Sequence, residues 1–132
     1  MAEHPNAALL RKGYEAFANG DMETIDTLFA DDIVWHVGGN SMLSGDYKGK
    51  EEVIGMFGRL FQETGGTFKI EIHDVLANDK HSVCINTISG ERNGARFETK
   101  GVDVFHPTPD GKVKEYWGLV EDQAVMDAAF AE

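Results

Sequence analysis

Residues 96–117, RFETKGVDVFHPTPDGKVKEYW, decide the fold, because they read as two strands joined by a turn. In an extended strand, successive side chains point to opposite faces. Arg96, Glu98 and Lys100 share one face, which we expect to meet water. Asp103 then lies on the other face, among aromatic side chains and toward the interior. A carboxylate in that position needs a partner, a proton or a chemical role.

The composition predicts a single domain, residues 1–132. The net charge of −11 argues against nucleic acid or an anionic membrane as a partner. No apolar run approaches the roughly 20 residues that span a bilayer, and the N-terminus lacks the order of a secretory signal. Because Cys84 is the single cysteine, we expect a cytoplasmic protein.

No motif predicts a cofactor or a metal. His4, His73, His81 and His106 are not spaced as metal ligands. No glycine-rich phosphate loop lies between a strand and a helix. We therefore expect the protein to bind neither a metal nor a cofactor.

Three apolar stripes at helical spacing predict three helices, which begin near Pro5, Asp21 and Lys50. Asn6 and Asp21 are the expected N-caps of the first two. Residues 33–37 (IVWHV) predict a short strand. Residues 38–49, rich in glycine and serine, predict a long loop over a site.

From residue 68 onward, the pattern predicts an antiparallel meander of four strands. Asn93 and Gly94 predict a tight hairpin turn, and residues 108–111 predict another. Asp122 is expected to cap a short closing helix. Helices gathered on one face of an antiparallel sheet make an α+β fold. If the sheet curls, the three helices close it into a cone with an apolar pocket.

The order of elements, read with FANGDMETIDTLFADDIVWHV (residues 17–37) and DVFHPTPDGKVKEYW (residues 103–117), resembles the NTF2-like superfamily. Within it, the chain looks most like the SnoaL-like proteins, which include polyketide cyclases, and the related ketosteroid isomerases. The resemblance implies a curved antiparallel sheet wrapped around three helices. It implies no single activity, since the superfamily holds isomerases, cyclases, hydrolases, dehydratases and members without chemistry.

The resemblance carries over to some residues and fails at others. Asp103 matches the pocket aspartate of both groups, which is a base in cyclases and a protonated donor in ketosteroid isomerases. Val37, beside His36, stands where the isomerases have their general-base aspartate. Their oxyanion tyrosine would fall at Gly13, one residue from Tyr14. Steroid isomerisation by the known constellation is therefore not expected.

Three residues are candidates for catalysis. Asp103 is either a general acid or base, or a buried aspartate bonded to a serine, a tyrosine or a backbone amide. His36 has a pKa suited to proton transfer, although alternation places Trp35 inward and His36 outward. Glu115 joins Asp103 if the face that it shares with Trp117 points inward; otherwise it pairs with a surface lysine or arginine.

Several aromatic residues either line a ligand cavity or simply fill the core. The candidates for ligand binding are Tyr14, Trp35, Phe57, Phe61, Phe105 and Trp117.

The first functional hypothesis is a cofactor-free isomerase or cyclase that transfers a proton on a small hydrophobic carbonyl compound. Tyr14 or His36 would hydrogen-bond the developing oxyanion. The alternatives are a binding or accessory module without chemistry, and an epoxide-hydrolase or dehydratase activity in the same pocket. The resemblance also implies a homodimer through the outer sheet face, where Cys84, Asn86 and Ile88 are expected.

Overall fold

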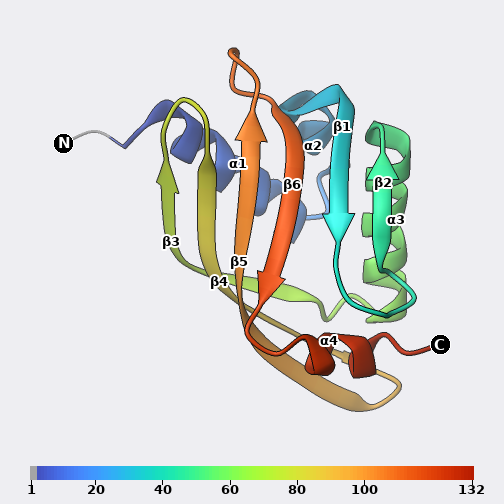
Figure 1. The fold of residues 1–132 in the computed structure, drawn as a ribbon. Coiled ribbons are helices and arrows are strands. Elements are labelled where there is room, and N and C mark those ends of the chain that lie inside the picture. The colour runs from blue at the N-terminus through green and yellow to red at the C-terminus, as the bar shows by residue number, and fades with distance from the viewer. Residues whose placement is uncertain (1–2) are drawn as a thin grey trace.

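The computed structural model describes residues 3–132 as a mixed, largely antiparallel sheet with four helices (Figure 1). The expected α+β class is confirmed. In chain order the elements are α1 (Pro5–Ala18), α2 (Met22–Leu28), β1 (Phe29–Val37), β2 (Gly45–Lys48), α3 (Lys50–Glu63), β3 (Lys69–Ala77), β4 (Ser82–Arg92), β5 (Ala95–Pro107), β6 (Val113–Val120) and α4 (Gln123–Ala129).

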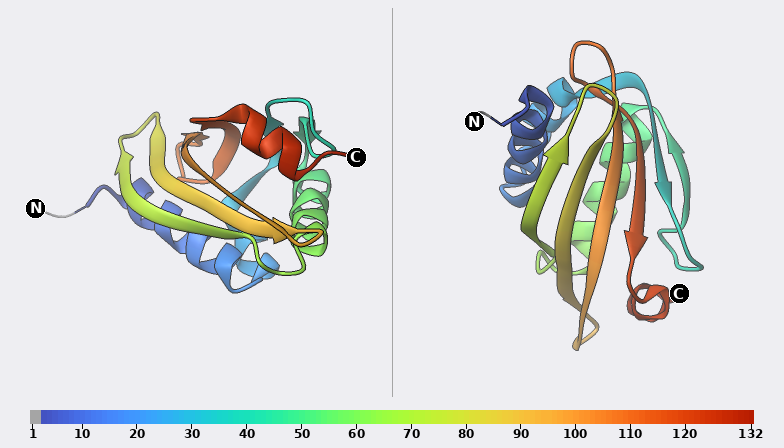
Figure 2. Two further views of the ribbon diagram at one scale, coloured as in Figure 1. Left: turned by 90° about the horizontal axis from the view of Figure 1, so that it is seen from below. Right: turned by 60° about the vertical axis from the view of Figure 1, so that its left-hand side comes forward.

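The six strands form one sheet in the order β2-β1-β6-β5-β4-β3. β1 pairs with β6 in parallel, and all other neighbours are antiparallel. The sheet is strongly curved, α1, α2 and α3 pack on its inner face, and α4 crosses one end (Figures 1 and 2). This arrangement is the expected cone, with its interior between the sheet and the helices.

Local signals explain most of the helix ends. The Asp21 side chain accepts a hydrogen bond from the Thr24 amide at 3.1 Å and so caps α2, as expected. Asp122 caps α4 in the same way, through the amide of Ala124. The cap of α1 is His4 rather than the expected Asn6, because Pro5 already occupies the first helical position, where its missing N–H costs nothing.

Two strand predictions need correction. β1 begins at Phe29, directly after α2, and not at Ile33. Residues 38–49 are not one loop, because Gly45–Lys48 form β2 and pair with β1. The remaining part, residues 38–44, lies beside the interior, and Gly38, Ser41 and Leu43 border the cavity described below.

The inner face carries the core. Along β5, Phe97, Thr99 and Asp103 are buried, whereas Arg96, Glu98 and Lys100 are exposed, so the predicted alternation is confirmed. The hairpin that joins β4 to β5 turns at Asn93 and Gly94, whose φ values of 55° and 81° suit the tight turn that was expected.

The outer face of the sheet is apolar and uncovered. Ile85, Val102 and Leu119 lie side by side in register. The adjoining row consists of Leu76, Val83, Val104 and Trp117. Leu119 is 62% exposed and Leu76 is 53% exposed, which marks this surface as one suited to association. Among residues 3–132, no helix is long and apolar enough to cross a membrane.

The prediction that Cys84, Asn86 and Ile88 lie on the outer face is wrong. Cys84, Asn86 and Ile88 are buried on the inner face, because Cys84 lies opposite the inward-facing Asp103. Val83 and Ile85, one position away on β4, take the outer side, since alternate residues of a strand point to opposite faces.

We expect the protein to form a homodimer through the outer face at micromolar concentration, because pairing two such faces removes their apolar side chains from water. Size-exclusion chromatography should show the dimer, and Leu119→Lys should shift the population toward monomer. Thr27→Lys, an equal charge change at an exposed position of α2, should leave the elution unchanged. Elution of the unmodified protein as monomer alone contradicts the expectation.

Candidate functional site

Asp103 lies in the middle of β5, with its side chain on the inner face and 6% exposed. In register it stands between Cys84 of β4 and Gly118 of β6. The alternation of β5 explains this position, because Phe105 and Gly101 on either side also point inward. The carboxyl group is therefore held inside the cone, away from bulk water.

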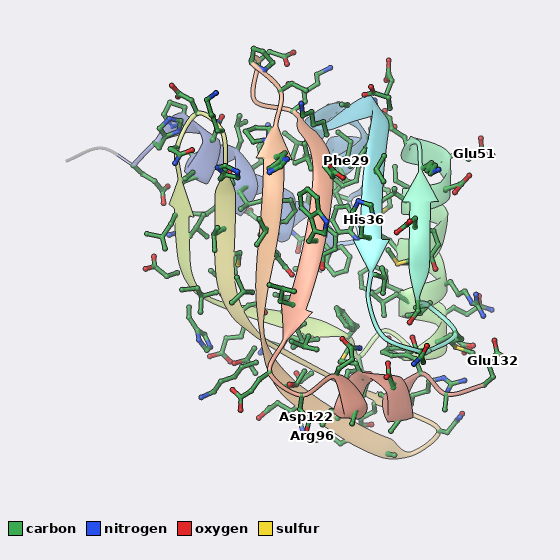
Figure 3. All side chains as sticks on the ribbon, in the orientation of Figure 1. Phe29, His36, Glu51, Arg96, Asp122 and Glu132 are labelled. Atoms are coloured by element: carbon green, nitrogen blue, oxygen red, sulfur yellow. The ribbon has the colours of Figure 1, made fainter. Side chains whose placement is uncertain are left out.

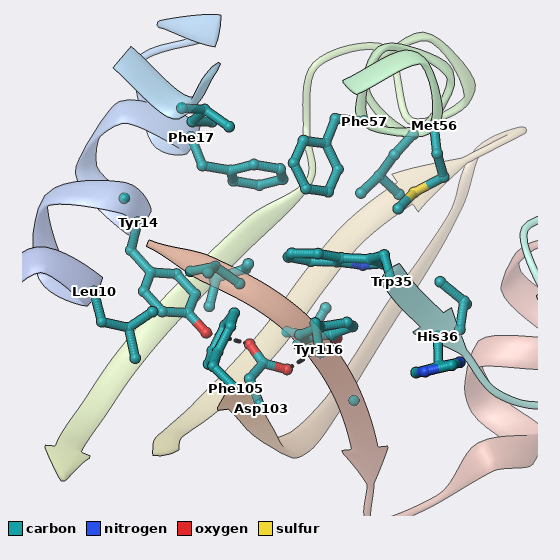
Figure 4. Close-up of a pocket in the computed structure, with 18 of the residues that line it drawn as sticks. Leu10, Tyr14, Phe17, Trp35, His36, Met56, Phe57, Asp103, Phe105 and Tyr116 are labelled. Atoms are coloured by element: carbon teal, nitrogen blue, oxygen red, sulfur yellow. Dashed lines mark hydrogen bonds between the residues drawn. The ribbon is translucent and has the colours of Figure 1, made fainter. Parts of the chain in front are cut away.

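Three side chains donate hydrogen bonds to this carboxyl group, and Figure 4 shows the two that come from Tyr14 and Tyr116. Tyr14 of α1 donates from Oη to Oδ2, and Asn86 of β4 donates from Nδ2 to the same oxygen at 3.1 Å. Tyr116 of β6 donates from Oη to Oδ1, also at 3.1 Å. Within residues 3–132 no basic side chain bonds this group, so it is a hydrogen-bonded buried acid rather than half of a salt bridge.

Two glycines make room for these partners. A Cβ at Gly118 would lie 2.2 Å from the Tyr116 hydroxyl oxygen, and a Cβ at Gly101 would lie 2.9 Å from Asn86 Oδ1. A side chain at Gly118 would thus push the hydroxyl away from Asp103. The absence of a side chain at both places lets the two donors reach the acid.

Asn86 is fully buried, and its Oδ1 finds no hydrogen-bond donor. Leaving a buried polar atom unpaired costs about 1–3 kcal/mol. The amide nevertheless keeps its Nδ2 on Asp103. Asn86 is therefore a positioning residue for the carboxyl group, held at some cost to stability.

The electrostatics of the site follow from burial. Loss of solvent raises the pKa of Asp103 from its ordinary value of 3.8, against the opposing effect of the three hydrogen bonds. Burial, and then the nearby charge of Asp103, raise the pKa of Tyr14 and of Tyr116 well above 10.0. Both tyrosines therefore remain hydrogen-bond donors, and the acid is the group that titrates.

The cavity beside Asp103 has a volume of about 190 Å³. Its walls are largely aromatic: Trp35 stacks on Tyr116 with ring centroids 3.8 Å apart, and Phe57 meets Trp35 edge-on at 5.0 Å. In Figure 4 the Tyr116 ring lies beside the carboxyl group of Asp103, Trp35 lies next to Tyr116, and Phe57 lies beyond Trp35. The chain thus offers an apolar chamber with one acid in its wall.

Four of the six aromatic candidates line this cavity, namely Tyr14, Trp35, Phe57 and Phe105. The other two do not. Phe61 packs against Phe17 in the core, with centroids 4.8 Å apart. Trp117 lies on the outer face and stacks on His36 there, so its assignment to the cavity is wrong.

His36 and Glu115 also belong to the outer face. The His36 ring bonds Glu115 through Nε2 at 2.8 Å and Asp46 through Nδ1 at 2.7 Å, and these contacts raise its pKa. Its strand borders the cavity, but the imidazole lies on the sheet face opposite α1 and α2 (Figure 3). The structure therefore does not bring His36 or Glu115 to Asp103.

A β-bulge explains why the parity argument for Glu115 fails. His106 pairs with Glu115 and Pro107 pairs with Val113, so Lys114 is an extra residue in β6. Val113 faces inward before the bulge, and Tyr116 faces inward after it. The inner positions after the bulge are Tyr116, Gly118 and Val120, which puts Glu115 and Trp117 outside.

Sequence reasoning missed two of the three partners of Asp103. Tyr116 is not among the candidate residues, and Asn86 is expected on the outer face of the sheet. No local signal marks either residue. Trp117 and Leu119 are as apolar as Tyr116 and Val120, so the pattern of β6 does not distinguish its inner face from its outer face.

Comparison with known proteins identifies the family. Residues 10–116 match the family model described as the SnoaL-like domain. An uncharacterised protein of Mycobacterium tuberculosis is 28% identical over 132 residues, which covers 99% of this chain and all of that protein.

Solved structures agree on the fold. Bal32a, from a soil-derived mobile gene cassette, is 36% identical with a TM-score of 0.91 and covers 95% of both chains. An NTF2-like protein from Burkholderia xenovorans has a TM-score of 0.81 at 18% identity, over 98% of each chain. IdmH from Streptomyces antibioticus, a candidate polyketide cyclase, has a TM-score of 0.76 at 18% identity, over 93% of this chain and 96% of its own. The last two establish an NTF2-like fold alone.

The raised pKa of Asp103 predicts a specific effect of pH on stability. A carboxyl group whose pKa is higher in the folded state stabilises the fold below its unfolded value of 3.8, and this contribution is lost as the pH rises through the folded value. The free energy of unfolding of the native protein should therefore fall more steeply than that of Asp103→Asn as the pH rises above 3.8.

Urea unfolding at a series of pH values measures this difference. Glu15→Gln, which removes an exposed carboxylate of α1, is the matched control and should keep the native slope. Parallel curves for the native protein and Asp103→Asn would mean that burial does not perturb the acid.

Proposed function

We propose, on the premise that this chain belongs to the SnoaL-like domain family, that it is an enzyme that moves a proton on a small hydrophobic carbonyl compound through the carboxyl group of Asp103. One observation carries the proposal. A single acid, 6% exposed and free of any salt bridge, stands in the wall of an apolar cavity. Burial brings the pKa of such a group closer to neutral pH, where general acid–base catalysis is most efficient.

The hydroxyl groups around Asp103 can donate hydrogen bonds to the substrate carbonyl oxygen. When the carboxylate removes a proton from the carbon next to the carbonyl, negative charge moves to the carbonyl oxygen. Tyr14 and Tyr116 stay protonated, since burial raises their pKa well above 10.0. Once Asp103 has become neutral, either O–H can turn from the carboxyl group to the enolate oxygen and stabilise it.

Among the described residues that line the cavity, Asp103 is the only one with a carboxyl group. His36 and Glu115, the other candidates, bond one another on the outer face. Asp103 therefore has to accept the proton and return it. The first C–H bond breaks as an O–H bond forms on the carboxyl group, and that O–H bond then breaks as a C–H bond forms at another carbon. This balance describes an isomerisation; ring closure is the variant in which the enolate carbon attacks a second carbonyl and the proton goes to the new alkoxide.

A different observation supports a second candidate function, the binding of a ligand without reaction. Asp103 already receives hydrogen bonds from Tyr14, Asn86 and Tyr116, so these bonds explain its position without any chemical role.

In the hydrolase or dehydratase variant, the same carboxylate activates a water or removes a proton in the same pocket.

Substitution of the acid tests the proposal directly. Asp103→Asn keeps the size of the side chain but cannot exchange a proton, so turnover of a panel of enolisable ketones should fall by about 100-fold or more. Glu115→Gln is the matched control, because that carboxylate lies on the outer face, and its turnover should equal that of the native protein. Circular dichroism shows whether each variant is folded. Unchanged turnover by a folded Asp103→Asn removes this residue from the mechanism.

Return of the proton by one carboxyl group predicts transfer of label within the substrate. A β,γ-unsaturated ketone that carries deuterium at the carbon between the two functional groups should yield product with part of the deuterium at the new position. Exchange with solvent is slowed because the acid is 6% exposed. Mass spectrometry and ²H NMR of the product measure the transfer, and complete replacement by solvent hydrogen contradicts a single-acid route.

A further inference from the structure

The size of the cavity limits what it holds. An apolar cavity of about 150 Å³ accepts one benzene ring. On that scale, the 190 Å³ beside Asp103 accommodates about eight non-hydrogen atoms. This is one ring with a few substituents. A fused four-ring compound of the steroid or tetracyclic polyketide kind is far larger than the space.

The charge of the cavity wall restricts the ligand further. Among the described residues that line it, none is lysine or arginine, and Asp103 is the single acidic side chain. A ligand carboxylate or phosphate would lose its water without gaining a cationic partner, which costs several kcal/mol. The net charge of −11 opposes the approach of an anion as well. The ligand therefore carries no negative charge.

The hydrogen bonds at Asp103 decide between a neutral ligand and a cation. Tyr14, Tyr116 and Asn86 already direct one hydrogen each at the two carboxyl oxygens. An ammonium group would add a further donor to this crowded pair. The three neighbours of Asp103 are all donors, and the hydroxyl groups of Tyr14 and Tyr116 can turn to a ligand oxygen instead. An acceptor atom on the ligand therefore fits the site better than a further donor.

From these three observations we propose that the cavity takes an uncharged molecule of one ring, about eight non-hydrogen atoms in size, whose single acceptor oxygen faces Asp103. A substituted cyclic ketone has this chemistry. The inference rests on the proposed function for the choice of Asp103 as the polar end of the site, but it concerns binding and does not need turnover.

A panel of probes that differ in one property each tests the inference. The reference is 3-methylcyclohex-2-enone. Cyclohexanecarboxylate changes the charge to negative, cyclohexylmethylamine changes it to positive, methylcyclohexane removes the acceptor oxygen, and a four-ring steroid ketone changes the size. Isothermal titration with each should show the reference binding at least about tenfold more tightly than any of the other four.

The two tryptophans report where the probe binds. Trp35 lines the cavity, whereas Trp117 lies on the outer face beside His36, so one protein contains both a reporter and its control. Addition of the reference ketone should shift the indole N–H resonance of Trp35 and leave that of Trp117 in place. Trp117→Phe assigns the two signals and, being outside the cavity, should bind the ketone as the native protein does.

The possible results separate this inference from the proposed function. Equal or tighter binding of the steroid, the carboxylate, the amine or the hydrocarbon overturns the inference, as does a shift at Trp117 alone. Selective binding together with unchanged turnover in Asp103→Asn leaves the ligand class standing and removes the catalytic role. Turnover that depends on Asp103 but accepts four-ring ketones as well as one-ring ketones supports the catalytic role and overturns the ligand class.

Discussion

One buried carboxyl group constrains the interior of this molecule. An acid that is 6% exposed has to be satisfied within the protein, and Asp103 draws its donors from three separate elements, α1, β4 and β6. The sheet leaves space for these donors by having glycine at positions 101 and 118. The same acid keeps its pKa above the ordinary value, because desolvation outweighs the three hydrogen bonds. Geometry and chemistry at the site thus share one physical origin.

A bulge in β6 decides which side chains of this strand face the interior and which lie on the outer face. Lys114 is inserted at a bulge, and the strand therefore presents Tyr116 rather than Glu115 to the interior. Without the bulge, regular alternation from Val113 would turn Glu115 and Trp117 toward the interior and Tyr116 toward the outer face. With it, Glu115 bonds His36 on the outer face, and the cavity retains a single acid.

Local sequence signals were reliable at most of the positions where a neighbouring residue decides the outcome. Asp21 caps α2 through the amide three residues on, and Asn93 and Gly94 take the backbone angles of their turn, both as predicted. Predictions failed where a more distant partner decides. Residues 45–48 became a strand because β1 offered an unpaired edge, and Asn86 faces inward because its strand pairs with β5 in that register. The N-cap of α1 moved to His4 for a local reason, the place of Pro5 in the first turn.

The sequence by itself determined the α+β class, the order of the helices and strands apart from β2, and the inward position of Asp103. Each of these depends on a period of two or about 3.6 residues that can be counted along the chain. Tertiary structure alone decided what surrounds that acid. Tyr14 reaches it from 89 residues away, and Tyr116 does so only after a bulge. Such contacts depend on the curvature of the sheet and on the register between strands, which are properties of the whole fold and not of any single segment.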